Sequence, residues 1–258
     1  MKSLIVALLV ALTVSVQAQS SGFDRNRLKI LHETTQSFVD QKQHAGIVTL
    51  LAHNGKIVDI HACGYRDIEN QLPMERDTIC RVYSMSKIIT CAATLILLEE
   101  GKFNLDDPVA NYLPELKNMK VWTGGTQANP QLEPLKRPIT IKHLLTHTSG
   151  MIYDFAGNDE LTKTWRAADL WSGPGLDSFI QKLSKLPLKH QPGDAYTYGA
   201  NQDVLGALIE RVSGMPFGEF LEQRIFRPLG MKDTGFYVPE EKRHRLAKTY
   251  KVVNGKFV

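Results

Sequence analysis

One segment of the chain, from about Ser84 to Glu100, is apolar almost all round when it is placed on a helix. Gly101 follows it and is a typical helix stop. A helix that is apolar on every side is normally buried among other elements. The segment therefore predicts a central helix inside a sizeable core, which a chain of 258 residues has the material to build.

The N-terminal part predicts a helix followed by a β-hairpin. Residues 24–43 carry apolar side chains at helical spacing, and Asp24 is placed to cap that helix. Residues 46–53 and 56–65 are rich in strand-forming side chains and are separated by Asn54-Gly55, a strong hairpin signal. The chain is thus expected to open as helix, strand, turn and strand.

The rest of the chain predicts helices in the middle and strands at the end. Further helices are expected at 140–146, within 169–186, at 201–212 and at 216–226. Residues 121–138, rich in Gly, Asn and Pro, are expected to form a surface loop, and 245–258 to form a strand pair around Asn254-Gly255. We therefore expect an α/β (α+β) domain over residues 19–258, with an antiparallel sheet built from both ends of the chain and an inserted, mostly helical region.

The first 18 residues have the pattern of a secretory signal peptide. Lys2 precedes an apolar run from Leu4 to Val16, and small residues lead to a predicted cleavage after Ala18. The run is short for a membrane span, although an uncleaved anchor is the alternative. The sequence predicts a secreted or periplasmic protein with no other membrane span.

Composition argues against several kinds of partner. The net charge of +4 comes from interspersed charges of both signs, so nucleic-acid binding is not expected. The three cysteines, Cys63, Cys80 and Cys91, are expected to be small buried side chains, with one disulfide as the alternative. No metal-ligand spacing or phosphate-binding loop is found, so no metal or cofactor is expected, and the predicted partner is a small-molecule substrate.

Ser84 and Lys87 lie three positions apart at the start of the central helix, and therefore on one face of it. A serine hydroxyl becomes a nucleophile when a base takes its proton, and a lysine in apolar surroundings is able to be that base. At a helix start, the Ser84 N–H is also placed to stabilise an oxyanion. The alternatives are that Ser86 is the nucleophile, or that the pair is a capping serine with an exposed lysine.

The segments around this pair resemble those of serine β-lactamases and penicillin-binding proteins, most closely class C β-lactamases and the family VIII type of carboxylesterases. The resemblance covers about Ala45 to Tyr250. Its main blocks are Ile79-Cys80-Arg81-Val82-Tyr83-Ser84-Met85-Ser86-Lys87, Leu105-Asp106-Asp107-Pro108-Val109, Ile139 to Gly150, Val212-Ser213-Gly214 and Pro228-Leu229-Gly230-Met231.

The resemblance implies a catalytic tyrosine in a second motif. Counting back from Asp203-Val204-Leu205-Gly206 puts it at Tyr198, with Tyr196 as the alternative. The family's asparagine position is then occupied by Ala200, and Asn201 lies one residue late. Because that asparagine holds the substrate amide in lactam-processing relatives, its replacement favours esters.

The resemblance also sets limits. His147 is expected to be structural, with no chemical step, and Ser149 to be a turn former. The family's third motif, a Lys-Thr-Gly or His-x-Gly strand that supplies the other oxyanion N–H, has no match. Lys248-Thr249-Tyr250 has no glycine and is interpreted as a strand, so the chain is expected to be C-terminally truncated. Residues 121–138 and 151–173 are expected to border the substrate entrance.

The resemblance thus implies a serine hydrolase that cleaves ester or amide bonds, with Ser84 as nucleophile and Lys87 and Tyr198 as proton relay. One alternative is a β-lactamase, a D-aminopeptidase or a penicillin-binding carboxypeptidase. The other is a non-catalytic truncated relative that only binds a ligand.

Overall fold

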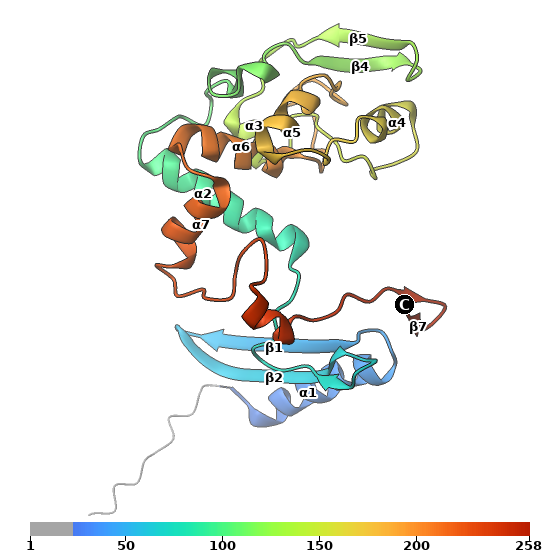
Figure 1. Cartoon of the computed structure of the whole chain (residues 1–258), viewed down its shortest axis with the longest axis vertical. Coiled ribbons are helices and arrows are strands. Elements are labelled where there is room, and N and C mark those ends of the chain that lie inside the picture. The colour runs from blue at the N-terminus through green and yellow to red at the C-terminus, as the bar shows by residue number, and fades with distance from the viewer. Residues whose placement is uncertain (1–22) are drawn as a thin grey trace, which may run out of the picture. The chain divides into compact units, whose positions relative to one another are not determined.

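The computed structural model describes residues 23–258, which divide into two compact units (Figure 1). The first unit combines residues 23–81 with Pro239–Val258, and the second is Val82–Val238. The predicted signal peptide, residues 1–18, lies outside the described residues. From residue 23 to residue 258, no helix has both the length and the apolar character needed to cross a membrane.

The strands are β1 (Gly46–His53), β2 (Lys56–Asp67), β3 (Leu72–Pro73), β4 (Lys120–Gly125), β5 (Pro130–Pro134), β6 (Val252–Val253) and β7 (Lys256–Phe257). The helices are α1 (Arg25–Asp40), α2 (Ser86–Glu99), α3 (Ile141–Leu145), α4 (Glu160–Ala167), α5 (Gly175–Leu183), α6 (Asn201–Ser213) and α7 (Phe217–Leu221). Short 3₁₀ turns lie at Tyr83–Met85, Val109–Asn111, Pro114–Leu116 and Glu240–Arg245, and a π-helical turn lies at Glu222–Phe226.

The first unit is built on an antiparallel sheet in the order β1-β2-β3, with α1 packed against β1 and β2 (Figure 1). Asn54 and Gly55 both have positive φ, as the tight turn between the first two strands requires. The Asp24 side chain accepts a hydrogen bond from the Asn26 N–H at 2.8 Å and so caps α1. The predicted helix and hairpin are confirmed.

Both ends of the chain contribute to this unit, but its three-stranded sheet holds N-terminal strands alone and not the predicted strands from both ends. Ile79 and Leu246 form a parallel bridge, and the Lys248 N–H donates to the Arg66 carbonyl. The C-terminal strand pair is shorter than predicted: β6 and β7 have two residues each, whereas the pair was expected over residues 245–258. Their hairpin is a separate two-stranded sheet. The interpretation of Lys248-Thr249-Tyr250 as a strand is wrong, since these residues belong to no strand. The Lys248 ammonium instead binds the side chains of Asp67 and Glu69.

The second unit is mostly helical, and α6 lies at its centre. This helix packs against α2, α3, α5 and α7 (Figure 1). Leu205 and Leu208 of α6 are fully buried, and Gly214 ends the helix in the left-handed conformation. The helices predicted at 140–146, 201–212 and 216–226 are confirmed, whereas α4 was not predicted.

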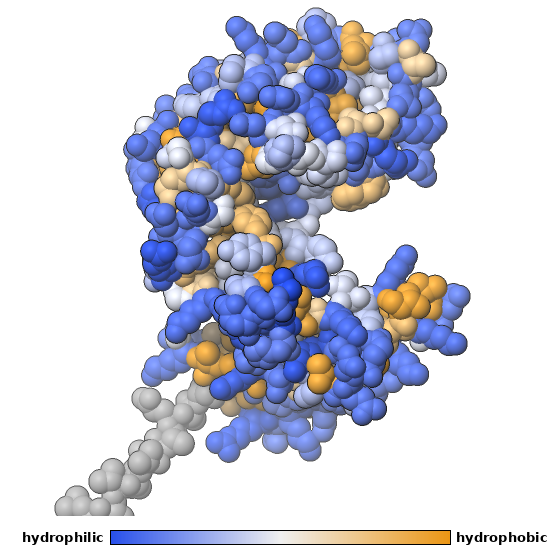
Figure 2. Space-filling model, viewed as in Figure 1, coloured by the Kyte–Doolittle hydropathy of each residue, from blue (hydrophilic) through white to orange (hydrophobic). Residues whose placement is uncertain are grey.

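Two expectations for the second unit are wrong. Residues 121–138 are not simply a loop, because β4 and β5 form a hairpin in which Val121 is buried and also bridges to Leu188. The central helix is not buried all round, since Ile88 is 69% and Leu95 47% exposed. Figure 2 accordingly shows hydrophobic residues at the surface over α2 and α7. The apolar side chains on all sides of this helix therefore did not mean that the helix is buried on all sides.

Candidate active site

Ser84 lies in a strained turn rather than inside the predicted helix. The 3₁₀ turn Tyr83–Met85 precedes α2, and Tyr83 has φ of 43°. A bulky residue in this left-handed region costs about 1–3 kcal/mol and persists only where the surroundings enforce it. The strain lies immediately before Ser84, whose side chain is exposed at the start of α2.

The side chains of Ser84, Lys87 and Tyr198 meet, although Tyr198 is 114 residues away from Ser84. The Ser84 Oγ and the Tyr198 Oη are 2.6 Å apart, and the Lys87 Nζ donates to the Ser84 Oγ at 3.2 Å. The Lys87 Nζ also lies 4.9 Å from the centre of the Tyr198 ring. All three belong to the second unit, so one compact body holds the candidate nucleophile and two proton-carrying side chains in hydrogen-bonding contact.

The electrostatics favour loss of the Tyr198 proton. The neighbouring Lys87 ammonium and the Ser84 hydroxyl hold the pKa of the Tyr198 phenol below its ordinary value. Lys87 itself is half-buried and lies beside hydroxyl groups and aromatic rings, not in the fully apolar setting expected from the sequence. The Lys87 charge therefore stabilises an anionic Tyr198 oxygen, which lies 2.6 Å from the Ser84 Oγ.

Neither of the two alternative residues from the sequence, Tyr196 or Ser86, is shown in this set of contacts. Tyr196 is largely exposed, and its ring lies beside His147, 5.9 Å between centres. Ser86 begins α2, and the lysine hydrogen bond goes to the Ser84 hydroxyl instead.

A buried network of hydrogen bonds holds the His147 ring that packs against Tyr198. The His147 ring stacks on the Tyr198 ring at 5.1 Å. The Ser149 hydroxyl donates to Asn201 Oδ1 at 2.5 Å, which leaves the Asn201 amide nitrogen to donate to His147 Nδ1 at 3.0 Å. His147 is therefore neutral and carries its proton on Nε2. Burial and the nearby Lys87 charge lower the pKa of His147, in agreement with the neutral form.

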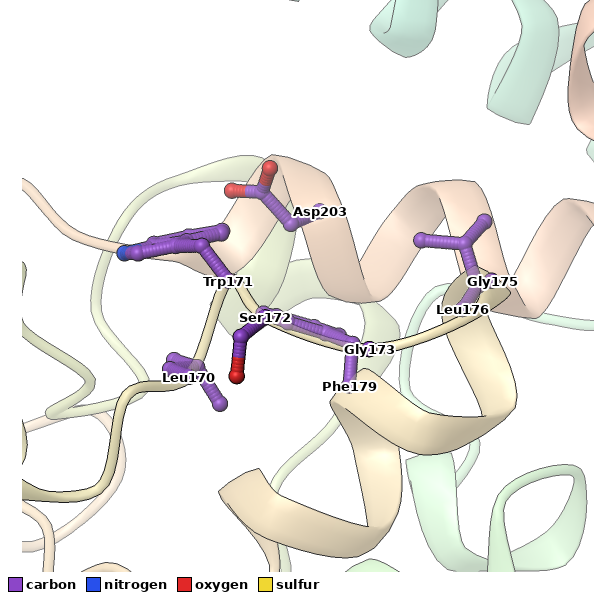
Figure 3. A pocket seen from close by; sticks show the side chains of 8 residues that line it. All are labelled: Leu170, Trp171, Ser172, Gly173, Gly175, Leu176, Phe179 and Asp203. Carbon is purple, nitrogen blue, oxygen red and sulfur yellow. The ribbon is translucent and has the colours of Figure 1, made fainter.

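Asp203 is an acidic group close enough to interact electrostatically with both Lys87 and Tyr198. The Tyr153 hydroxyl donates to the Asp203 carboxylate at 3.4 Å, and burial raises the pKa of both side chains. Asp203 and Lys87 line one cavity of about 240 Å³, whose other walls include Phe217 and Phe236. Asp203 also lines a second cavity of about 160 Å³, seen in Figure 3.

No group of three or more His, Cys, Asp and Glu side chains between residues 23 and 258 is arranged to hold a metal ion. Cys63, Cys80 and Cys91 are all free thiols. Cys63 is buried as predicted, but Cys80 is exposed.

Sequence reasoning missed the contacts of three residues at the site. His147 was assigned no role beyond structure, Asn201 was considered only as a displaced motif residue, and Asp203 only as an alignment anchor. Asn201 and Asp203 were visible as polar residues at the start of a predicted helix, but nothing local to the sequence pairs Asn201 with a histidine 54 residues away.

Comparison with known proteins gives the same family as the sequence motifs. The family model described as Beta-lactamase matches residues 31–256. An uncharacterized protein of Mycobacterium tuberculosis is 38% identical over 208 residues, which are 81% of this chain and 51% of that protein. Esterase EstB of Burkholderia gladioli is 34% identical over 214 residues, covering 79% of this chain and 50% of EstB.

A solved structure adds the fold. EstCE1, described as a hydrolase with promiscuous acyltransferase activity, has a TM-score of 0.79 and 29% identity, covering 91% of this chain and 59% of EstCE1. The fold is therefore that of β-lactamases and transpeptidases, as predicted. The chain spans about half the length of the curated relatives it matches.

Proposed function

The chain belongs to the β-lactamase family, and on that basis we propose that it is a serine hydrolase that cleaves ester bonds through an acyl-enzyme on Ser84. The observation that supports this most is the contact of the Ser84 hydroxyl with Tyr198 at 2.6 Å and with Lys87 at 3.2 Å. The likeness to Esterase EstB supports an ester as the substrate, and the likeness to EstCE1 supports a hydrolase.

In the acylation step, the Ser84 Oγ attacks the ester carbonyl carbon and its proton passes to the Tyr198 oxygen. The Lys87 ammonium beside that oxygen favours its anionic form and so makes it a stronger base near neutral pH. The Ser84 N–H stabilises the oxyanion. The tetrahedral intermediate then expels the alcohol, which takes the proton back from Tyr198.

In deacylation, water takes the place of Ser84 as the nucleophile, and Tyr198 keeps its role. A water molecule attacks the acyl-Ser84 carbonyl while Tyr198 takes a proton from the water, and Ser84 leaves with that proton. His147 makes no proton transfer in this scheme, because its Nδ1 accepts a hydrogen bond from Asn201 and its ring stacks on Tyr198.

An ester is favoured over a lactam because Ala200 stands where lactam-processing relatives are expected to have asparagine. Ala200 is fully buried, and the Asn201 amide is bound to His147 and Ser149. No amide side chain from these two positions is therefore available to a lactam substrate.

The test is hydrolysis of p-nitrophenyl acetate by the wild-type chain and by Ser84→Ala. We expect turnover that the substitution abolishes. Equal turnover by both proteins contradicts the proposal, and binding of a ligand without turnover favours a non-catalytic relative. Stoichiometric acylation by a fluorescent penicillin at Ser84 would instead favour the β-lactamase or penicillin-binding alternative.

We also propose that the protein is exported, which rests on the signal-peptide pattern of residues 1–18. N-terminal sequencing of the protein recovered from the medium or periplasm should begin after Ala18. Recovery from the cytoplasm alone, with Met1 retained, contradicts this.

A further inference from the structure

Three aromatic rings, Tyr153, Phe155 and Trp171, lie in a continuous row beside the active-site tyrosine, and we call them the aromatic shelf. The Tyr153 ring centre lies 5.4 Å from that of Tyr198. Phe155 stacks on Tyr153 at 4.9 Å and an interplanar angle of 11°, and Trp171 lies 5.9 Å from Tyr153. Tyr153, the middle ring of the shelf, therefore adjoins the tyrosine that contacts Ser84.

The outer two rings of the shelf are open to solvent. Phe155 is 72% and Trp171 45% exposed, whereas Tyr153 between them is buried. Single exposed apolar side chains are ordinary, but two exposed aromatic rings on either side of one buried ring, close to the proposed nucleophile, favour a ligand-binding surface. Core packing does not account for the exposed faces of these two rings.

The two loops that carry the outer rings are each held by a cationic side chain. The Lys182 Nζ donates to two backbone carbonyl oxygens of the loop that carries Trp171, at 2.8 and 2.6 Å. Arg166 Nη2 donates to two carbonyl oxygens that flank Phe155, both at 3.0 Å. The shelf is thus preorganised, which reduces the conformational entropy lost when a ligand binds.

A cavity opens beside Trp171, at the end of the shelf. Its volume is about 160 Å³, and the Trp171 ring, Leu176 and Phe179 line it together with the Asp203 carboxylate (Figure 3). A cavity of about 150 Å³ is large enough for benzene. The space thus suits one aromatic ring, and its acidic wall disfavours an anionic group.

We propose that the aromatic shelf and this cavity bind the aryl group of a neutral ester while its carbonyl carbon lies at Ser84. The proposal rests on the proposed esterase function and specifies its substrate class as esters with a planar aromatic group. An aryl ring against Trp171 gains stacking as well as burial of apolar surface. The ring belongs to either the acyl or the alcohol part, and the test separates the two.

The test compares vinyl acetate, phenyl acetate and vinyl benzoate, with acid release followed by titration at constant pH. Phenyl acetate carries its ring on the alcohol and vinyl benzoate on the acyl group. We expect Trp171→Ala to lower the ratio of kcat/KM for one aryl ester to that for vinyl acetate about tenfold, mainly through KM. Trp171→Phe should restore most of that ratio, because it keeps a ring.

The matched controls are exposed aromatic residues elsewhere in the same unit. Tyr237→Ala should leave the ratio unchanged, and Phe236→Ala tests the other cavity. Unchanged ratios for both aryl esters in Trp171→Ala, or a loss in Phe236→Ala alone, overturn the proposal.

A binding measurement separates failure of the shelf from failure of the esterase function. In Ser84→Ala, which should not hydrolyse the esters, phenyl acetate and vinyl benzoate are titrated while tryptophan fluorescence is recorded. At least one should change the emission with saturation, and Trp171→Phe in the same background should abolish the change. Saturable binding in a wild-type chain that hydrolyses none of the three esters supports the shelf and contradicts only the esterase function. Absence of binding contradicts the shelf whatever the turnover.

Discussion

Asn201 offers the most direct test of how the site is supported. Its side chain is fully buried, accepts from the Ser149 hydroxyl and donates to His147 Nδ1. Asn201→Ala removes both hydrogen bonds and leaves two buried polar groups without these partners. Each unsatisfied group costs about 1–3 kcal/mol. The Met151 N–H still donates to the Ser149 hydroxyl and the Gly199 N–H to His147 Nδ1, so the free energy of unfolding should fall by about 3 kcal/mol, in the lower part of the summed range.

Equilibrium urea denaturation measures this change, and the melting temperature should fall by roughly 6–12 °C. The matched control is Asn158→Ala, because Asn158 is exposed and should change the free energy of unfolding by less than about 0.5 kcal/mol. Loss of Asn201 should also lower kcat, since the imidazole stacked on Tyr198 loses its anchor. A destabilisation no larger than that of the control refutes the network as a source of stability.

Three further predictions concern proton transfer, packing and pH. The positive charge of Lys87 lowers the pKa of Tyr198, and Lys87→Arg keeps that charge whereas Lys87→Gln removes it. The rise of kcat/KM with pH should therefore occur at higher pH in Lys87→Gln than in Lys87→Arg, and coinciding pH–rate profiles contradict this. Gly199→Ala should destabilise the chain by about 2 kcal/mol or more in urea titrations, because its Cβ would lie 2.1 Å from the Met151 carbonyl oxygen; an unchanged midpoint opposes this. Burial by itself raises the pKa of Asp67, but hydrogen bonds from Asn70 and Lys248 outweigh it and lower that pKa to about 2. The stability that this lowered pKa contributes is present above about pH 4 and is lost as the pH falls towards 2. Asp67→Asn should therefore flatten this part of the plot of unfolding free energy against pH, and an unaltered plot contradicts the prediction.

The sequence predicts the elements whose signals are local. Asp24 caps α1, Asn54-Gly55 forms a tight turn, and Gly214 ends α6, because each depends on the conformational preference of one or two residues. The hairpin of β4 and β5 was missed because its Gly and Pro content is typical of loops. Its buried Val121 is held partly by the distant Leu188.

The site shows the same division. Spacing on one helix suggests Ser84 and Lys87, and a family resemblance was needed to add Tyr198, because 114 residues separate it from Ser84. The partners of His147 and Asp203 depend on how loops and helices pack, which no periodicity in the sequence encodes. The exposure of Ile88 likewise could not be derived from hydropathy alone, because an apolar side chain indicates a preference for burial and not the neighbour that covers it.

Covalent labelling of Ser84 tests the central claim most directly. The intact chain is treated with a fluorophosphonate, digested and analysed by mass spectrometry, with Ser84→Ala and Ser86→Ala treated in the same way. The proposed mechanism predicts one adduct, on Ser84, that is present in Ser86→Ala and absent from Ser84→Ala. An unlabelled wild-type chain, or equal labelling of Ser84→Ala, contradicts the assignment of Ser84 as the nucleophile.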